Sequence, residues 1–403
     1  ATGDHIVVGD TLRIYEDHVT IRQSTIAPIT IAHMAFYDNS DDADINFTAV
    51  DADPDTLVID DGSELLILAG SEFALGGNLQ SGLSGIDDIE IRGTLTCAAS
   101  EVIRISGTWV NTGTFTAASS EVIFDAAAGT EDIDSTGATL DNFYDITFDG
   151  AGTFELESVL DVDHDVVINQ GILDTKLGVS YDISVSGSWD NNATFQARQG
   201  TVFFDATSGS PTIDSSGATL DDFYNVKVND TGNGVTFTLN SVFDANNDLI
   251  ITSGTLDANG QTIYAGGKWD NNGTFTANGS TVVFDATATG KTIEAGASSF
   301  YNITFNSGSG GWTLQTDNVT VTNDFLLSAA NDFTLQSGRT LEVQGLFGNS
   351  VGGGATTWTG TTLYLNDSGS STINSRTGSG DIYATLRIGA NQYTRMWHSS
   401  AST

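Results

Sequence analysis

The segment Ser186-Gly-Ser-Trp-Asp-Asn-Asn-Ala-Thr-Phe195 is the most informative part of the chain, because near copies of it recur at a fixed step. The copies are Ser106-Gly-Thr-Trp-Val-Asn-Thr-Gly-Thr-Phe115 and Gly266-Gly-Lys-Trp-Asp-Asn-Asn-Gly-Thr-Phe275. Their tryptophans, Trp109, Trp189 and Trp269, are 80 residues apart, and a Phe-Asp-Ala marker beginning at Phe124, Phe204 and Phe284 keeps the same step. Self-similarity at a fixed period is the signature of a repeat architecture.

A finer pattern lies inside each unit. Short runs of β-branched and aromatic residues, such as Glu121-Val-Ile-Phe124 and Asp165-Val-Val-Ile168, are separated by clusters of Gly, Asn, Asp and Ser. These are strand and turn signals, and no helical period of 3.6 residues continues for more than a turn. Because about four circuits of roughly 20 residues fit each unit, we predict an all-β chain, a parallel β-solenoid of roughly 20 rungs built from ~80-residue repeats.

The composition fits a solenoid. The chain has 403 residues with 45 Gly and only 3 Pro. Tight corners need residues that accept positive φ or that satisfy nearby backbone groups, whereas proline would remove a donor from the ladder. The alternative is a tandem array of β-sandwich domains. No Pro-rich or charge-dense linker separates the units, which favours the solenoid.

The markers divide the chain into five segments, whose ends are expected to be atypical because a terminal rung must cover open backbone groups. We expect the three marker tryptophans to fill the core, with a ligand-stacking stripe as the alternative. The segments are diverged N-terminal rungs and cap (1–105), three repeats (106–185, 186–265 and 266–345) and a shortened C-terminal repeat or assembly end (346–403).

The charge excludes whole classes of partner. Lys and Arg number 13 against 52 Asp and Glu, giving a formal charge of −39. Binding to nucleic acid or to an anionic lipid surface depends on Lys and Arg, so we expect neither. No apolar run is long enough for a membrane helix, and the single Cys97 cannot form an internal disulfide. The numbering opens at Ala1, which fits a mature exported chain, so we expect an extracellular or cell-surface location.

Two aligned acidic triplets are the candidate metal site. Asp161-x-Asp163-x-Asp165 aligns with Asp244-x-Asn246-x-Asp248 in the next unit. Alternating side-chain oxygens at a corner could bind Ca²⁺, and local Asx-turn bonding is the alternative. We predict no catalytic or cofactor-binding residue: Gly348-Asn-Ser-Val-Gly352 matches a nucleophile motif but lies in a Gly-rich stretch with no helix signal. Ca²⁺ is the one candidate ion, and no cofactor is required.

The Trp-Asp-Asn-Asn, Phe-Asp-Ala and Phe-Tyr strings resemble the β-strand-repeat surface proteins of bacteria and archaea, of the β-solenoid adhesin, sheath or filament type. The resemblance covers about residues 106–345 and implies adhesion, surface coating or filament building. We therefore expect an extracellular structural protein, not an enzyme, that assembles into a filament, sheath or surface layer. The alternatives are the stalk or binding region of a large adhesin and, less favoured, a polysaccharide-active β-helix enzyme.

The two ends of the chain differ in charge. Residues 1–60 carry 12 acids with only Arg13 and Arg22, whereas residues 382–403 carry Arg387 and Arg395 and no acid. A head-to-tail contact between unlike ends adds copies into a fibre. We therefore expect self-association head to tail, with surface glycans as further candidate partners.

Overall fold

The computed structural model describes part of the 403-residue chain. Within the described residues every regular element is a β-strand, and no helix there is long and apolar enough to cross a membrane. The described residues are 7–14, 19–22, 29–36, 43–48, 56–59, 64–67, 71–76, 78–80, 88–97, 100–137, 143–217, 223–230, 234–366, 372–375, 382–389 and 395–398.

The chain divides into two compact units. Unit 1 comprises residues 1–200 and 216–221, and unit 2 comprises residues 201–215 and 222–403. The strands of unit 1 are β1 (Val7–Ile14), β2 (Val19–Arg22), β3 (Ile29–Phe36), β4 (Ala43–Thr48), β5 (Thr56–Ile59), β6 (Glu64–Ile67), β7 (Ser71–Gly76), β8 (Asn78–Gln80), β9 (Asp88–Ile91), β10 (Thr94–Cys97), β11 (Val102–Ile105), β12 (Trp109–Asn111), β13 (Thr114–Thr116), β14 (Glu121–Phe124), β15 (Thr130–Asp134), β16 (Asp145–Phe148), β17 (Thr153–Leu156), β18 (Leu160–Val162), β19 (Val166–Ile168), β20 (Ile172–Asp174), β21 (Ile183–Val185), β22 (Trp189–Asn191) and β23 (Thr194–Gln196).

Unit 2 has the same kind of elements. Its strands are β24 (Thr201–Phe204), β25 (Thr212–Asp214), β26 (Asn225–Asn229), β27 (Thr236–Leu239), β28 (Phe243–Ala245), β29 (Leu249–Ser253), β30 (Thr255–Asp257), β31 (Thr262–Ala265), β32 (Trp269–Asn271), β33 (Thr274–Thr276), β34 (Thr281–Phe284), β35 (Lys291–Glu294), β36 (Asn302–Leu314), β37 (Val319–Val321), β38 (Phe325–Leu335), β39 (Thr340–Val343), β40 (Phe347–Asn349), β41 (Thr356–Thr357), β42 (Thr362–Leu365), β43 (Thr372–Ser375), β44 (Thr385–Ile388) and β45 (Arg395–His398).

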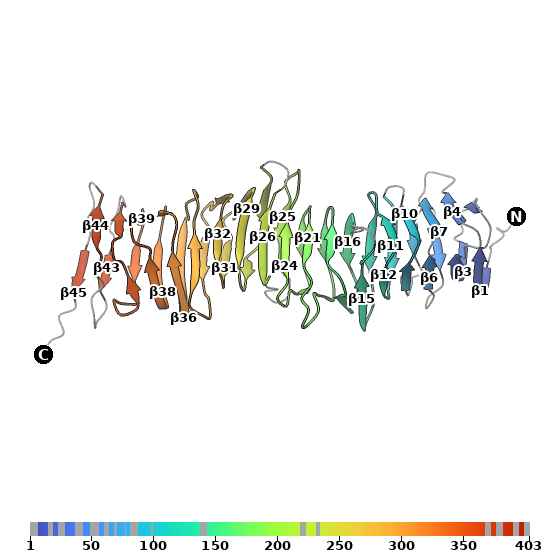
Figure 1. Cartoon of the computed structure of the whole chain (residues 1–403), viewed down its shortest axis with the longest axis horizontal. Helices are drawn as coiled ribbons and strands as arrows, with labels where there is room; N and C mark the ends of the chain where they lie inside the picture. The colour runs from blue at the N-terminus through green and yellow to red at the C-terminus, as the bar shows by residue number, and fades with distance from the viewer. Residues whose placement is uncertain are drawn as a thin grey trace. The chain divides into compact units, whose positions relative to one another are not determined.

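Unit 1 is a parallel β-solenoid, in which each strand pairs with the strand one turn earlier and one turn later (Figure 1). One ladder runs β8–β11–β14–β16–β19–β22, and a second runs β6–β9–β12–β15–β17–β20–β23. The chain therefore visits these ladders in turn, with a third face formed by β2–β4–β7–β10–β13 and, further along, by β18 and β21.

Unit 2 coils in the same way. Its ladders are β25–β27–β30–β33, then β28–β31–β34–β36–β38–β40, and β24–β26–β29–β32–β35 continuing into the C-terminal halves of β36 and β38. Every pairing between the described strands is parallel with a partner on another turn. The β-sandwich alternative, which requires antiparallel strands inside separate modules, is therefore wrong.

The predicted fold class is confirmed, but the number of rungs is not. In the described part of the chain the solenoid makes about 13 turns, which does not support the expectation of roughly 20 rungs. Most circuits exceed the assumed 20 residues: Glu121 pairs with Asp145, and Met34 pairs with Leu65. The turn lengths vary because polar insertions at the corners lengthen a circuit without disturbing the pairing of its strands.

The expectation that an 80-residue block is the structural unit is not supported either, since the turn is the repeating element of the pairing. Trp109 pairs with Ile89 and Ile133, whereas Trp189 pairs with Val166 in a different ladder. The sequence step is therefore not a whole number of turns, and it moves a marker from one face of the coil to another. That the predicted segment boundaries are also domain boundaries stays a prediction.

Alternate residues of each strand fill a narrow core. In unit 1, Ile105, Phe124, Phe148 and Ile168 occupy successive rungs of one ladder, and all are fully buried. Stacking like residues at the rung spacing buries apolar surface on every turn. The rings of Phe124 and Phe148 are stacked at a centroid separation of 5.5 Å.

The marker tryptophans belong to this core, as the core interpretation predicted. Trp109, Trp189 and Trp269 are fully buried. Each meets the phenylalanine six residues later edge to face, with centroids 5.0, 4.9 and 5.0 Å apart. The indole N–H groups of Trp109 and Trp269 have no conventional hydrogen-bond partner. In an edge-to-face contact between a tryptophan and a phenylalanine, the indole N–H can face the π system of the partner ring.

Candidate cation site at the solenoid corners

The predicted acidic triplets lie at equivalent corners of the two units. Asp161 is in β18, its backbone carbonyl accepts from Phe143 N–H at 3.0 Å, and Asp163 N–H donates to Phe143 O at 2.8 Å. Asp244 and Asn246 make the same two bonds with Phe223 in unit 2, at 3.0 and 2.8 Å. The backbone of these four residues therefore belongs to the ladder, and Ca²⁺ binding by the triplets stays a prediction.

The third residue of each triplet holds the next turn in place. The Asp165 carboxylate accepts the backbone N–H of Ser188 at 2.7 Å, and the Asp248 carboxylate accepts that of Lys268 at 2.9 Å. Both bonds reach one turn ahead, so they differ from the local Asx turn considered as the alternative. A carboxylate that accepts a backbone N–H forms a charge-assisted bond, which fixes both the side chain and the following turn.

A common set of four residues builds each corner of this kind. The first residue opens one strand, the second and third precede the strand one turn later, and the fourth is a glycine another turn on. The sets are the Asp145 corner (Asp145, His164, Asp165, Gly187), the Asn225 corner (Asn225, Asn247, Asp248, Gly267) and the Asn302 corner (Asn302, Asn323, Asp324, Gly345).

The two corners in unit 2 use amides for the first two residues. Asn247 Nδ2 donates to Asn225 Oδ1, and Asn323 Nδ2 donates to Asn302 Oδ1, both at 2.8 Å. The same Asn302 oxygen accepts the backbone N–H of Asp324 at 3.2 Å. Neutral side chains are therefore sufficient to build this corner.

The glycine is required because the third residue packs against it. A β-carbon on Gly187 would lie 2.4 Å from Asp165 Oδ1, and one on Gly345 would lie 2.7 Å from Asp324 Oδ1. Real β-carbons do not approach an oxygen so closely, so any larger residue would displace the carboxylate. Gly187, two residues before the marker Trp189, is therefore required for a steric reason.

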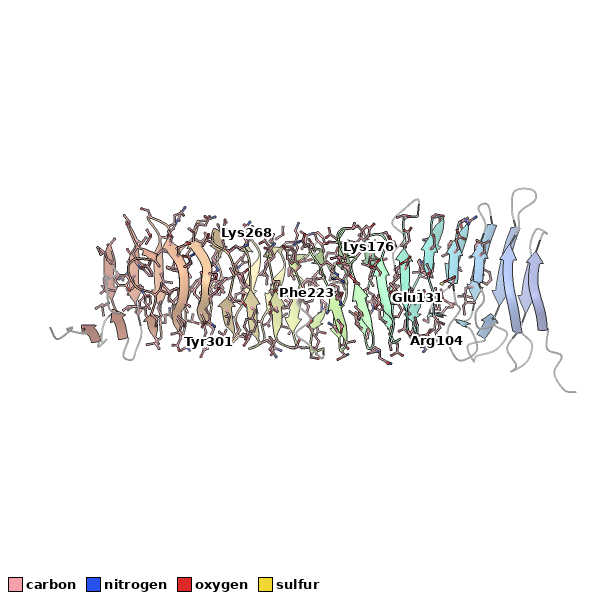
Figure 2. All side chains as sticks on the ribbon, turned by 90° about the horizontal axis from the view of Figure 1, so that it is seen from below. Arg104, Glu131, Lys176, Phe223, Lys268 and Tyr301 are labelled. Carbon is pink, nitrogen blue, oxygen red and sulfur yellow. The ribbon has the colours of Figure 1, made fainter. Side chains whose placement is uncertain are left out.

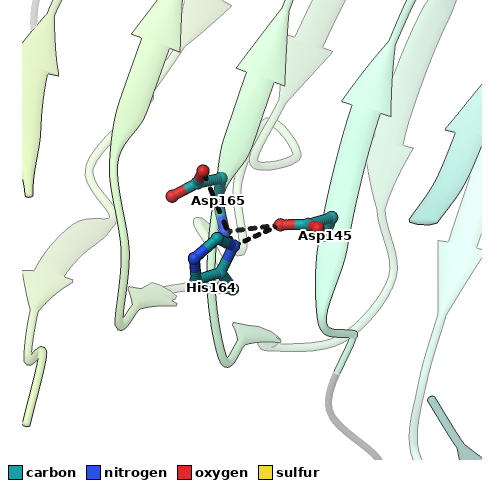
Figure 3. A group of neighbouring side chains, drawn as sticks. All are labelled: Asp145, His164 and Asp165. Carbon is teal, nitrogen blue, oxygen red and sulfur yellow. Dashed lines mark hydrogen bonds and ion pairs between the residues drawn. The ribbon is translucent and has the colours of Figure 1, made fainter. Parts of the chain in front are cut away.

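The Asp145 corner carries different chemistry on the same frame (Figure 3). His164 Nδ1 lies 2.6 Å from Asp145 Oδ1 and 3.5 Å from Asp165 Oδ2. Asp145 Oδ1 also accepts the backbone N–H of Asp165 at 3.1 Å. The imidazole stacks on the Tyr144 ring, with centroids 4.8 Å apart and planes inclined by 9°. One ligand atom from each of Asp145, His164 and Asp165 can be chosen so that all lie within 4.8 Å of one another.

A second group with metal-ligand chemistry lies elsewhere in unit 1. Asp132, Glu155 and Glu157 also offer three oxygens within 4.8 Å of one another. Lys176 already occupies part of this group, because its ammonium pairs with Glu157 and lies 3.5 Å from Glu155. Burial, followed by the neighbouring Glu157 charge, raises the pKa of Asp132, and the hydrogen bond to Glu157 raises the pKa of Lys176. This arrangement is an ion-pair cluster of the coil surface.

Buried asparagines close another set of corners. Asn111, Asn191 and Asn349 are fully buried or nearly so, and each side-chain oxygen accepts the backbone N–H two residues later, at 3.1, 3.0 and 3.1 Å. Each therefore forms an Asx turn that points into the coil. In the copies at Trp109 and Trp189, the Trp-x-Asn motif thus pairs a core residue with a turn residue. In the third copy Asn271 instead donates its Nδ2 to the Ala295 carbonyl at 3.0 Å.

Asp165 was among the predicted metal ligands, whereas Asp145 and His164 were not. The histidines showed no metal spacing because Asp145 and His164 are 19 residues apart and meet only through the coil. One signal was present: the Phe-Tyr marker is followed by Asn at Asn225 and Asn302 but by Asp at Asp145. Of the predicted residues, Asp161, Asp163, Asp244 and Asp248 belong to neither His/Cys/Asp/Glu group found in the described part of the chain.

The fold and these corners define a class, namely a parallel β-solenoid whose turns are tied together by side-chain oxygens. Comparison with protein-family models, with curated proteins and with solved structures finds no match for this chain.

Proposed function

We propose that this protein is an extracellular structural protein that assembles head to tail into a surface filament, sheath or surface layer. The observation that carries the proposal is that the recurring sequence motifs serve the coil itself. The marker tryptophans fill the core, the buried asparagines close turns, and the corner carboxylates hold the backbone of the following turn. Motifs that are used to stabilise the coil are what a structural protein needs, so they support a structural role.

The acidic composition limits the partners of such a protein. A formal charge of −39 keeps an extended polar surface soluble and disfavours binding to anionic polymers. Figure 2 labels three of the scarce basic side chains of the described part, Arg104, Lys176 and Lys268. Each has a carboxylate partner: Asp125 at 3.6 Å for Arg104, Glu157 for Lys176, and Asp270 at 2.6 Å for Lys268.

A ladder edge at β44 supports assembly. Among the described strands, β44 is the end member of the ladder β37–β39–β42–β44. The backbone N–H groups of Thr385 and Gly389 donate to the preceding turn, at 3.1 and 2.8 Å. Because N–H directions alternate along a strand, the N–H of Ile388 points to the other edge, where another strand can pair.

The experiment compares the full chain with Ile388→Pro, which removes that outward donor, and with the matched control Ile388→Ala. Light scattering after size-exclusion chromatography and negative-stain electron microscopy are expected to show concentration-dependent filaments for the full chain and the control, but not for Ile388→Pro. A monodisperse monomer at every concentration would contradict assembly and favour the alternative, the stalk of a large adhesin.

A further inference from the structure

We propose that the Asp145 corner is a binding site for a divalent transition-metal ion of the Zn²⁺ class, with Asp145, His164 and Asp165 as ligands. The proposal concerns a site that self-assembly does not use. It follows from comparing three corners that share one backbone design and differ in two side chains.

The comparison shows that the charged groups are not needed to build the corner. At the Asn302 corner, Asn323 donates to Asn302 at 2.8 Å, which is the contact that His164 makes with Asp145 at 2.6 Å. Two neutral amides therefore perform the structural task. Replacing them with a carboxylate and an imidazole adds a negative charge and a nitrogen ligand beside a second carboxylate, without adding a bond to the fold.

The three side chains are held by backbone N–H groups and a neighbouring ring, as metal ligands usually are held by a second layer of contacts. Asp145 is fixed by the Asp165 backbone N–H, Asp165 by the Ser188 N–H, and the His164 ring by Tyr144. Each bonded carboxylate oxygen leaves a second oxygen on the same side chain. The ligands are therefore oriented before an ion arrives.

The geometry favours zinc-like ions over Ca²⁺. An imidazole nitrogen and carboxylate oxygens are ligand types that Zn²⁺ takes in three-ligand sites, whereas Ca²⁺ takes six to eight oxygens. The side chains are 30% (Asp145), 46% (His164) and 39% (Asp165) exposed, so water can complete the coordination. A ligand nitrogen must carry no proton, so His164 would bind the ion through Nδ1 with its ring proton on Nε2.

The test is isothermal titration of the untagged full chain with ZnCl₂. We expect one site per chain that is tighter than the background of surface carboxylates. The double variant Asp145→Asn/His164→Asn recreates the amide corner of unit 2, so it is expected to fold and to lose at least about tenfold in affinity at this site. Circular dichroism and thermal unfolding of the metal-free variant check that it folds.

The chain also offers the reverse experiment. Asn302→Asp/Asn323→His transplants the ligands to the Asn302 corner, where Tyr301 takes the place of Tyr144, and should raise the stoichiometry from one to two. The Asn225 corner is less suitable because Lys291 Nζ lies 3.5 Å from Asn247. The proposal is overturned if zinc affinity is unchanged in Asp145→Asn/His164→Asn, or if the full chain binds no zinc above background.

Discussion

Arg198 reaches back one turn to form a two-pronged ion pair with Asp174, from Nε to Oδ1 at 2.8 Å and from Nη2 to Oδ2 at 2.5 Å. The Asp174 side chain is only 6% exposed, and its Oδ1 also accepts the backbone N–H of Lys176 at 2.9 Å. A buried carboxylate is stable only when such partners compensate for the loss of water.

Arg198→Ala is expected to lower the free energy of unfolding by roughly 1.5–3 kcal/mol, because it leaves the buried Asp174 charge without its main partner. Solvent screens the partly exposed Arg198 guanidinium, which limits the size of this loss. Denaturant unfolding measures the change. Adding Asp174→Asn to Arg198→Ala removes the stranded charge and should recover part of the loss. A double variant that is less stable than Arg198→Ala would show that Asp174 contributes independently of Arg198.

Gly150 should not tolerate a side chain. A β-carbon there would lie 2.2 Å from the carbonyl oxygen of Ala126 on the preceding turn, and backbone cannot move aside cheaply. Gly150→Ala is expected to lower the free energy of unfolding by roughly 1–3 kcal/mol or more. Gly308→Ala is the matched control, because no atom lies within 4 Å of the position that its β-carbon would take, and its effect should stay within about 0.5 kcal/mol. Equal losses in the two variants would refute the steric explanation.

Asp125 should contribute stability at low pH and lose that contribution as the pH rises. Burial raises its pKa above the ordinary value of 3.8, although the Arg104 charge opposes the shift. The folded state therefore binds the Asp125 proton more tightly than the unfolded state, so this residue's contribution is fully present below 3.8 and is lost as the pH rises through the folded value. The stability of Asp125→Asn relative to the natural chain should thus increase as the pH is raised from below 3.8 to neutral. A relative stability that falls over this interval would contradict the assignment.

Cys97 should be unreactive while the protein is folded. Its side chain is 2% exposed, and burial raises the pKa of the thiol to about 12. Since the thiolate is the nucleophile, a maleimide or disulfide reagent at mildly alkaline pH should label the thiol only after denaturation. Rapid labelling of the native chain, followed by mass spectrometry, would show that this turn opens readily.

The architecture could be predicted from the amino-acid sequence, because period and composition act locally. The 80-residue spacing of Trp109 and Trp189, the short β-branched runs and the turn residues between them are sufficient for a parallel β-solenoid with the tryptophans in its core. The number of turns could not be predicted, since corner insertions change the length of a circuit while leaving the strand pattern intact.

The contact between Asp145 and His164 arises only on folding, because coiling brings together residues about one turn apart. No short sequence motif specifies the length of that turn. Folding also separates Asp165, whose carboxylate faces His164, from Asp161 and Asp163, whose backbones pair with Phe143. Side chains one rung apart meet through the hydrogen-bonded register of the ladder, and that register is a property of the folded coil.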